Sequence, residues 1–165
     1  MENPFKPTEK DWRIIVITAV AALLSISVIA LIDSQYHDPY LIASFGATAV
    51  LIYGAPKAPF SRPKNVFFGH LFSAVVGVSI AMVFDFAGLY TDWWWFATGL
   101  AVSLAITVMI LTDTVHPPGG ATALTCVING FFGPVYIIRP VMLGVVIMMA
   151  IAYAANILKD RCSSD

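Results

Sequence analysis

The chain has 165 residues, of which 59% are hydrophobic and only 12% are charged. A soluble domain of this length lacks the interior to bury so much apolar surface, so lipid must solvate much of it. The net charge of −1 excludes a basic surface for nucleic acid. The two cysteines, Cys126 and Cys162, fall in an apolar span and a charged tail, which favours free thiols over a disulfide.

The apolar segments follow one another with only short polar breaks between them. We expect a polar N-terminal segment at 1–13, a single transmembrane domain at 14–158 and a polar tail at 159–165. Four apolar runs are long enough to cross the ~30 Å hydrocarbon core as helices, and two are shorter. The long runs are Ile14–Ile32, Val66–Phe86, Trp93–Leu111 and Ile137–Leu158, and the short ones are Leu41–Ala55 and Gly119–Phe131.

The third span carries small residues at intervals of four, namely Gly69, Ser73 and Gly77. Residues spaced by four lie on one face of a helix, and small side chains there allow another helix to approach closely. That helix could belong to the same bundle or to a second copy of the chain. The stripe is therefore our predicted contact surface for a homo-oligomer.

The most unusual stretch is DTVHPPGGATAL, which begins at position 113 and leads into the second short segment. Its two prolines forbid a regular helix through His116, whereas Pro118 or Gly119 can open a new one. The amides of Gly119, Gly120 and Ala121 would then project without side chains to cover them, and a helix N-terminus of this kind favours an anion. The alternative is an ordinary tight turn between two spans.

The positive charges distinguish between two topologies, in which the short segments either cross the membrane or re-enter it. With six crossings and a cytoplasmic N-terminus, only Arg139 of the nine Lys and Arg residues lies outside, which leaves eight inside. With four crossings, Lys57, Arg62 and Lys64 join it outside, which leaves five inside. The positive-inside rule prefers the first arrangement. We therefore predict six crossings with both termini cytoplasmic.

The two halves of the chain resemble each other. Three landmarks recur in order: GATAV at 46–50 with GATAL at 120–124, Arg62-Pro63 with Arg139-Pro140, and Gly69 with Gly144. Each repeat, about 14–86 and 93–158, holds three crossings, so the halves insert with opposite orientation around a pseudo-two-fold axis in the membrane plane. The predicted fold is thus an all-α polytopic membrane helix bundle of two inverted three-span repeats, with short broken second and fifth spans.

The two short helices mark the predicted binding site. A helix from Ser44 to Ala55 is only ~18 Å long, so we expect both short helices to start near the midplane with their N-termini facing each other. Thr48 and Thr122 then fall in the first turns, where their hydroxyls can cap or donate. The predicted substrate-binding residues are Ser44, Gly46, Ala47, Thr48, His116, Gly119, Gly120, Ala121 and Thr122.

Two histidines are candidates for carrying a coupled proton. His116 lies next to the predicted site, although it could instead only bind a backbone carbonyl in the turn. His70 lies one turn or so inside the third span, where we expect it to be close enough to the surface to contact water. We find no residue pattern suited to hydrolysis and no metal motif, so we expect neither an enzyme, a cofactor nor a bound metal.

The segment Thr114–Leu124 resembles the signature of the HPP family of integral membrane proteins, named for its His-Pro-Pro run. Ser44–Val50, Arg62–Asn65 and Gly69-His70 resemble the first-half pattern of that family, and the resemblance covers about residues 12 to 158. The family is usually described with four spans, whereas the charges here favour six. Members in cyanobacteria and plastids are linked to nitrite transport, which implies a small monovalent anion as the substrate.

These observations together predict a transporter or channel for a small monovalent anion, nitrite above all, in a bacterial inner membrane. The predicted partners are this anion, the lipid bilayer and a second copy of the chain. Two other functions stay open. One is a channel for a small neutral polar solute, and the other is a membrane scaffold or assembly protein that transports nothing.

Overall fold

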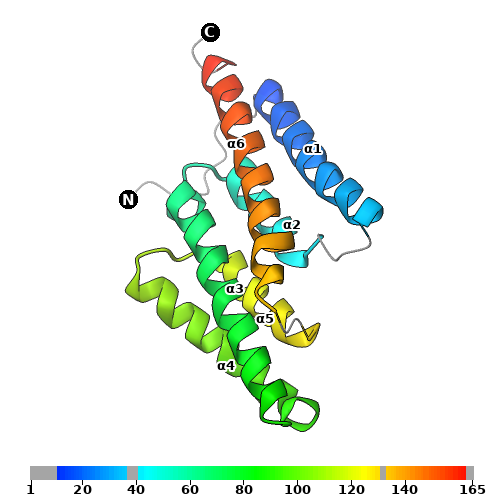
Figure 1. Cartoon of the computed structure of the whole chain (residues 1–165). Coiled ribbons are helices and arrows are strands. Elements are labelled where there is room, and N and C mark those ends of the chain that lie inside the picture. The colour runs from blue at the N-terminus through cyan, green and yellow to red at the C-terminus, as the bar shows by residue number, and fades with distance from the viewer. Residues whose placement is uncertain (1–10, 37–40, 131–132, 163–165) are drawn as a thin grey trace.

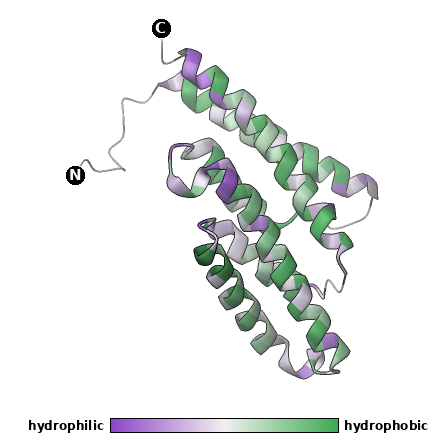
Figure 2. Ribbon diagram, turned by 60° about the vertical axis from the view of Figure 1, so that its left-hand side comes forward, coloured by the Kyte–Doolittle hydropathy of each residue, from purple (hydrophilic) through white to green (hydrophobic). Residues whose placement is uncertain are grey.

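The computed structural model describes residues 11–36, 41–130 and 133–162, and all regular secondary structure within these ranges is helical (Figure 1). Figure 2 shows apolar residues along much of the length of these helices, as expected for lipid-solvated elements. The predicted all-α membrane bundle is confirmed. The elements are α1 (Trp12–Tyr36), α2 (Ala43–Ala49), the π-helical η1 (Val50–Gly54), the 3₁₀ turn η2 (Pro59–Ser61), α3 (Pro63–Phe86), α4 (Tyr90–Leu111), α5 (Pro117–Ile128), the π-helical η3 (Ile137–Met142) and α6 (Leu143–Cys162).

Four helical segments of the described chain are long and apolar enough to cross a membrane: α1, α3, α4, and η3 with α6. The two short segments are also as expected, because α2 with η1 covers only Ala43–Gly54 and α5 has 12 residues. Of the predicted N-terminal segment and tail, residues 1–10 and 163–165 lie outside the described residues.

The long helices extend beyond the predicted spans, since helical hydrogen bonding continues past the apolar run into the polar flanks. The shifts are Trp12 instead of Ile14 for the start of α1, Pro63 instead of Val66 for α3, Tyr90 instead of Trp93 for α4, and Cys162 instead of Leu158 for the end of α6.

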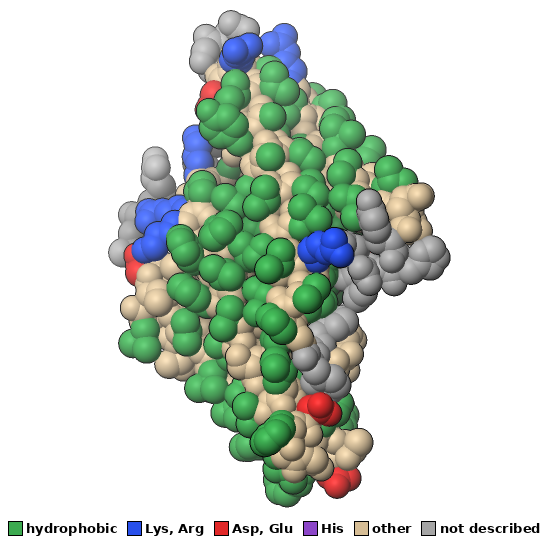
Figure 3. Space-filling view, in the orientation of Figure 1, with side chains coloured by type: hydrophobic (Ala, Val, Ile, Leu, Met, Phe, Trp, Pro, Cys, Tyr) green, Lys and Arg blue, Asp and Glu red, His purple; other side chains and the backbone are tan. Residues whose placement is uncertain are grey.

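The helices alternate in direction along the chain. In Figure 1, α1, α3 and α5 run toward the lower end of the molecule, and α2, α4 and α6 run back toward the upper end. A topology with four crossings would require α1 and α3 to run in opposite directions, because α2 would return to the side from which it came. The directions therefore agree with six crossings. Figure 3 shows most of the visible Lys and Arg side chains in the upper half, where α1 begins and α6 ends.

Matching Arg-Pro pairs set the start of the third helix in each half. Arg62 is extended with ψ 139° before Pro63, and Arg139 is extended with φ −128° and ψ 114° before Pro140. Proline forces the preceding residue toward extended backbone and itself fits the first turn of a helix. The sequence predicted one regular span from Ile137, whereas the structure breaks this span at Arg139.

The two halves also pack reciprocally. A Cβ at Gly119 of α5 would lie 2.8 Å from the carbonyl oxygen of Gly69 in α3, and a Cβ at Gly144 of α6 would overlap the ring of Phe45 in α2. Residues 45 and 119 are matching positions of the repeat, as are 69 and 144. In addition, α1 packs against α6 as α4 packs against α3. A two-fold axis generates this exchange of contacts, which supports the predicted inverted repeat.

The small-residue stripe of α3 allows close helix approach, but within the chain. A Cβ at Gly77 would lie 2.7 Å from the carbonyl oxygen of Ala123 in α5, and Ser73 is fully buried. Because α5 occupies the face formed by Gly69, Ser73 and Gly77, that face is not open to a second copy. The prediction of a homo-oligomer through these residues does not fit the structure.

Alanine substitutions at the glycines test this packing. Gly69→Ala and Gly144→Ala should each destabilise the protein by about 1–3 kcal/mol, since the added methyl group has no room. Gly99 of α4 is the matched control, because nothing lies within 4 Å of its Cβ position. Gly99→Ala should be neutral or stabilise by about 0.5–1 kcal/mol. Thermal unfolding in detergent measures the difference, and equal midpoints for Gly69→Ala and Gly99→Ala would contradict the described contact.

Thiol labelling tests the number of crossings. Single cysteines at Pro59 and Val135, in a protein with Cys126 and Cys162 replaced by alanine, should react differently with a membrane-impermeant reagent in intact cells. Val135 is 66% exposed, and we expect labelling there from outside because it precedes the sixth crossing. The cysteine at Pro59 should react only after the membrane is opened. Labelling at Pro59 from outside would restore the four-crossing topology.

Candidate functional site

A buried group of polar side chains lies where α2 crosses α5 beside α3. We call it the histidine cluster, and each member is at most 1% exposed. Its members are Ser44 and Thr48 of α2, His70 of α3, and His116 and Thr122 at the start of α5. Both repeats therefore contribute to it. Polar groups that are buried away from water must find hydrogen-bond partners inside the protein.

The hydroxyl of Thr48 joins the two imidazoles. Thr48 Oγ1 lies 2.8 Å from His70 Nε2 and 3.2 Å from His116 Nε2. The rings of His70 and His116 meet edge to face with centroids 4.9 Å apart. The other nitrogen of His116, Nδ1, lies 2.8 Å from the carbonyl oxygen of Phe60. Since a carbonyl oxygen only accepts, Nδ1 of His116 carries a hydrogen and donates it.

The remaining contacts extend the chain of hydrogen bonds to the start of α2. His70 Nδ1 lies 2.8 Å from Thr122 Oγ1, and the Thr122 hydroxyl donates to Ser44 Oγ at 2.9 Å. Thr48 also contacts the carbonyl oxygen of Ser44 one turn before it, at 3.0 Å. Each imidazole nitrogen and each hydroxyl of the cluster therefore has a partner, which makes its complete burial tolerable.

Local sequence explains how His116 reaches this position. Pro117 begins α5 and holds His116 in extended backbone, with φ −138° and ψ 103°. The chain therefore turns at His116, and its side chain lies against α3, where Gly69 leaves room for it. Asn65 of α3 donates from Nδ2 to the carbonyl oxygen of Val115 at 2.9 Å, which fixes the turn from the other side.

The cluster is symmetric in its hydroxyls but not in its histidines. Thr48 and Thr122 are matching positions, 74 residues apart. With the same offset Ile42 matches His116, and with the offset of 75 that relates Gly69 to Gly144, Val145 matches His70. The hydroxyls are uncharged, so the histidines are the titratable groups of the cluster. Lys64 and Asp113, which form an ion pair at 3.5 Å nearby in the sequence, are 55% and 97% exposed and lie outside it.

The structure brings five of the predicted residues together, Ser44, Thr48, His70, His116 and Thr122, as the histidine cluster. The prediction that His70 contacts water is wrong, because its side chain is 0% exposed. The other predicted residues lie elsewhere. Gly46 and Ala47 are exposed, Gly120 and Ala121 are half-buried, and Gly119 packs on Gly69 of α3.

The short helices do not face each other end to end as predicted. Ser44 pairs with Thr122 and Thr48 with His116, so α2 and α5 lie antiparallel and side by side with their first turns overlapping. The prediction of uncovered amides at a helix start near Gly119 is also wrong. The helix begins at Pro117, two residues before Gly119, and the Gly119 amide donates to the carbonyl oxygen of His116 at 2.8 Å. Prolines at the first two helical positions have no N–H to offer.

Sequence reasoning missed two members of the surroundings. The carbonyl oxygen of Phe60 holds His116, and the ring of Phe45 lies edge-on to His70 at 5.9 Å between centroids. A backbone carbonyl carries no sequence signal, so Phe60 was not detectable. Phe45 belonged to the run resembling the family pattern, but nothing in that run indicated a contact with a histidine of another helix.

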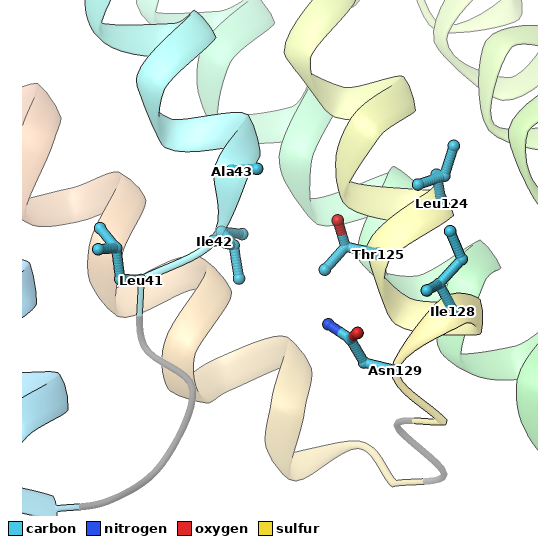
Figure 4. A pocket seen from close by; sticks show the side chains of 7 residues that line it. All are labelled: Leu41, Ile42, Ala43, Leu124, Thr125, Ile128 and Asn129. Carbon is cyan, nitrogen blue, oxygen red and sulfur yellow. The ribbon is translucent and has the colours of Figure 1, made fainter.

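A pocket of about 210 Å³ lies beside the Ser44 end of the cluster (Figure 4). In Figure 4, Thr125 and Asn129 point from α5 toward the start of α2. Ala43 precedes Ser44, and Thr125 follows Thr122 by about one helical turn, so the lining includes sequence neighbours of both residues but neither residue itself. The lining residues are Leu41, Ile42, Ala43, Leu124, Thr125, Ile128 and Asn129.

These features define a polytopic helical membrane protein of two inverted repeats with a buried polar centre. The pattern described as "HPP, transmembrane region" matches residues 7–163, and the chain belongs to this HPP transmembrane family, as the resemblance predicted. Two transmembrane proteins of Dictyostelium discoideum are similar: one is 39% identical over 92% of this chain and 54% of its own length, the other 38% over 91% and 50%. The chain thus spans about half the length of these curated relatives. No solved structure matches the chain.

Removing one hydroxyl tests the cluster. Thr48→Val keeps the shape of the side chain but leaves imidazole nitrogens without a partner, so it should destabilise the protein by about 1–3 kcal/mol. Thr107→Val on α4 is the matched control, because Thr107 is exposed and its hydroxyl also contacts the carbonyl oxygen four residues earlier, at 2.9 Å. Thermal unfolding in detergent should show a clear loss for Thr48→Val alone. Equal midpoints would show that the cluster is not held by this hydroxyl.

Proposed function

We propose that this protein moves a small monovalent anion across the membrane, with nitrite as the first candidate substrate. The histidine cluster is the observation that carries the proposal. Polar groups inside a membrane domain are expensive to bury and usually serve function. Short helices at matching positions of two inverted repeats, with polar groups at their crossing, are typical of transporter binding sites.

The chemistry of the cluster favours an anion over a cation. Its side chains offer hydroxyl and imidazole hydrogens, and no carboxylate is among them. His116 is also the N-cap residue of α5, where the helix dipole adds a partial positive charge. Nitrite is small and has oxygen acceptors that these donors suit. Its choice among small anions follows from the resemblance to family members linked to nitrite transport.

The proposal requires a change of conformation. Because every member of the cluster is at most 1% exposed, the anion reaches it only when α2 and α5 move apart. The pocket beside Ser44 and Thr122 offers an entrance from one side, with Thr125 and Asn129 as polar lining. Rocking of one repeat against the other would open the opposite side. The proposed location is a bacterial inner membrane with both termini cytoplasmic.

Nitrite uptake into proteoliposomes tests the proposal. The purified chain should take up nitrite faster than protein-free vesicles do. Thr122→Val should lose most of this uptake, since it removes a hydroxyl that faces the Ser44 end of the cluster, whereas Thr122→Ser keeps the hydroxyl and should retain uptake. Thr107→Val should behave as the parent protein.

Two results would contradict the proposal. The first is a folded parent protein that takes up no nitrite above the protein-free level, which would favour a scaffold. The second is parental uptake by Thr122→Val, which would place the path away from the cluster. Uptake of a neutral solute such as urea in place of nitrite would support the neutral-solute channel.

A further inference from the structure

We infer that the histidine cluster is a proton relay, which carries one proton between its Ser44 end and its His116 end. The relay deepens the proposed function, on which its link to transport rests, because it names the proton as the ion that accompanies the anion. The inference depends on counting donors and acceptors along the chain of hydrogen bonds.

When both histidines are neutral, the hydrogens can be arranged in only one direction that satisfies the imidazoles. Nδ1 of His116 already donates to Phe60, so Nε2 must accept from Thr48. Thr48 has a single hydrogen, which in this arrangement is given to His116 and not to the Ser44 carbonyl oxygen, and so Thr48 must accept from Nε2 of His70. Nδ1 of His70 then accepts from Thr122, so in this arrangement Thr122 accepts from the Ser44 hydroxyl instead of donating to it. All of these hydrogen bonds point from the Ser44 end toward His116.

One added proton reverses this arrangement without moving a heavy atom. If His116 carries hydrogens on both nitrogens, Nε2 donates to Thr48, and Thr48 donates to Nε2 of His70. Nδ1 of His70 then donates to Thr122, and Thr122 donates to Ser44, which is the direction that its geometry favours at 2.9 Å. Each imidazole nitrogen is again satisfied, and now the hydrogen bonds between the side chains all point toward Ser44.

The two arrangements are joined by a balanced transfer. A proton that binds the Thr122 oxygen releases the Thr122 hydrogen to Nδ1 of His70. The hydrogen on Nε2 of His70 then passes to the Thr48 oxygen, and the Thr48 hydrogen passes to Nε2 of His116. Each hydroxyl oxygen along the way loses one bond to hydrogen and gains another, and the His70 ring gains a hydrogen at Nδ1 and loses one at Nε2. The net result is one proton taken up at Thr122 and one positive charge on His116.

The two ends of the relay are buried but lie toward opposite ends of α5. The pocket of about 210 Å³ near the end of α5 is lined by Ala43, which precedes Ser44, and by Thr125, three residues after Thr122. His116 lies at the start of α5 and donates to Phe60, which is 42% exposed in the loop before α3. That loop carries three of the basic residues predicted to be cytoplasmic, Lys57, Arg62 and Lys64. The relay thus connects the predicted outer and inner sides.

The same geometry sets the number of protons. The groups that face the imidazoles are the Ser44 and Thr48 hydroxyls from α2, the Thr122 hydroxyl from α5 and the Phe60 carbonyl, and none of them carries a charge. His70 and His116 are 4.9 Å apart, so two positive charges would repel each other strongly. One positive charge also offsets that of an anion, which is costly to bury alone. The cluster therefore holds one proton at a time, and we infer one proton per nitrite.

Simultaneous measurement of nitrite and proton uptake tests the relay. The full chain is placed in vesicles with an internal pH-sensitive dye, nitrite is added outside, and potassium with valinomycin sets the membrane potential. Protein-free vesicles correct for nitrous acid that crosses the lipid. We expect internal acidification in step with nitrite uptake, at rates that do not depend on the potential. Thr48→Val and His116→Gln should lose the acidification, and Thr107→Val should keep it.

Each outcome decides one of the two proposals. Nitrite uptake without acidification, driven by an inside-positive potential, would overturn the relay and leave anion transport standing. Proton flux down a pH gradient that Thr48→Val abolishes, without any nitrite uptake, would support the relay and contradict the anion. Parental acidification in Thr48→Val would overturn the relay, as would the absence of both fluxes. If Thr48→Val fails to fold, His116→Gln decides, since it keeps a donor toward Phe60 but has no ring nitrogen that can take up the proton.

Discussion

The close approach of α5 to α3 is the constraint on which the polar centre depends. Gly69 has no side chain, and a Cβ there would collide with the Cβ of His116. His116 can lie against α3 only because this space is empty, and only then does it reach Thr48 and Phe60. Gly119 and Gly77 extend the same contact along the two helices. Small residues are usual at helix contacts in membranes, because packing must replace the hydrophobic effect there.

Burial of the cluster imposes a second condition. Lipid and packed helices supply no water, so an imidazole or a hydroxyl without a partner would cost several kcal/mol, on the order of the desolvation of a polar group. Short hydrogen bonds between Thr48, His70 and Thr122 meet this condition with side chains alone. The helices that carry these residues are thereby held together by polar contacts as well as by packing.

Much of the fold could be predicted from the sequence because lipid imposes simple rules. Long apolar runs indicated the four long helices, and the Arg-Pro pairs and the GAT motifs indicated the inverted repeat. The site was only partly predictable. Thr48, Thr122 and His116 could be singled out because their motifs are unusual, but their side-chain partners lie 22 to 78 residues away in sequence. The overlap of the short helices depends on where α5 begins. The helix α5 begins at Pro117, two residues before the predicted start at Gly119, and the apolar pattern does not reveal this.

The mismatch between hydroxyls and histidines has a consequence for the free energies of the two facing states. In an inverted repeat with identical halves, exchange of the halves would convert the inward-open state into the outward-open state, and the two would be equally populated. His70 and His116 have Val145 and Ile42 as their counterparts, so this equivalence is broken at the centre of the molecule. In the proposed transport cycle the two facing states therefore differ in free energy even without a gradient, and the protonation of these histidines contributes to that difference.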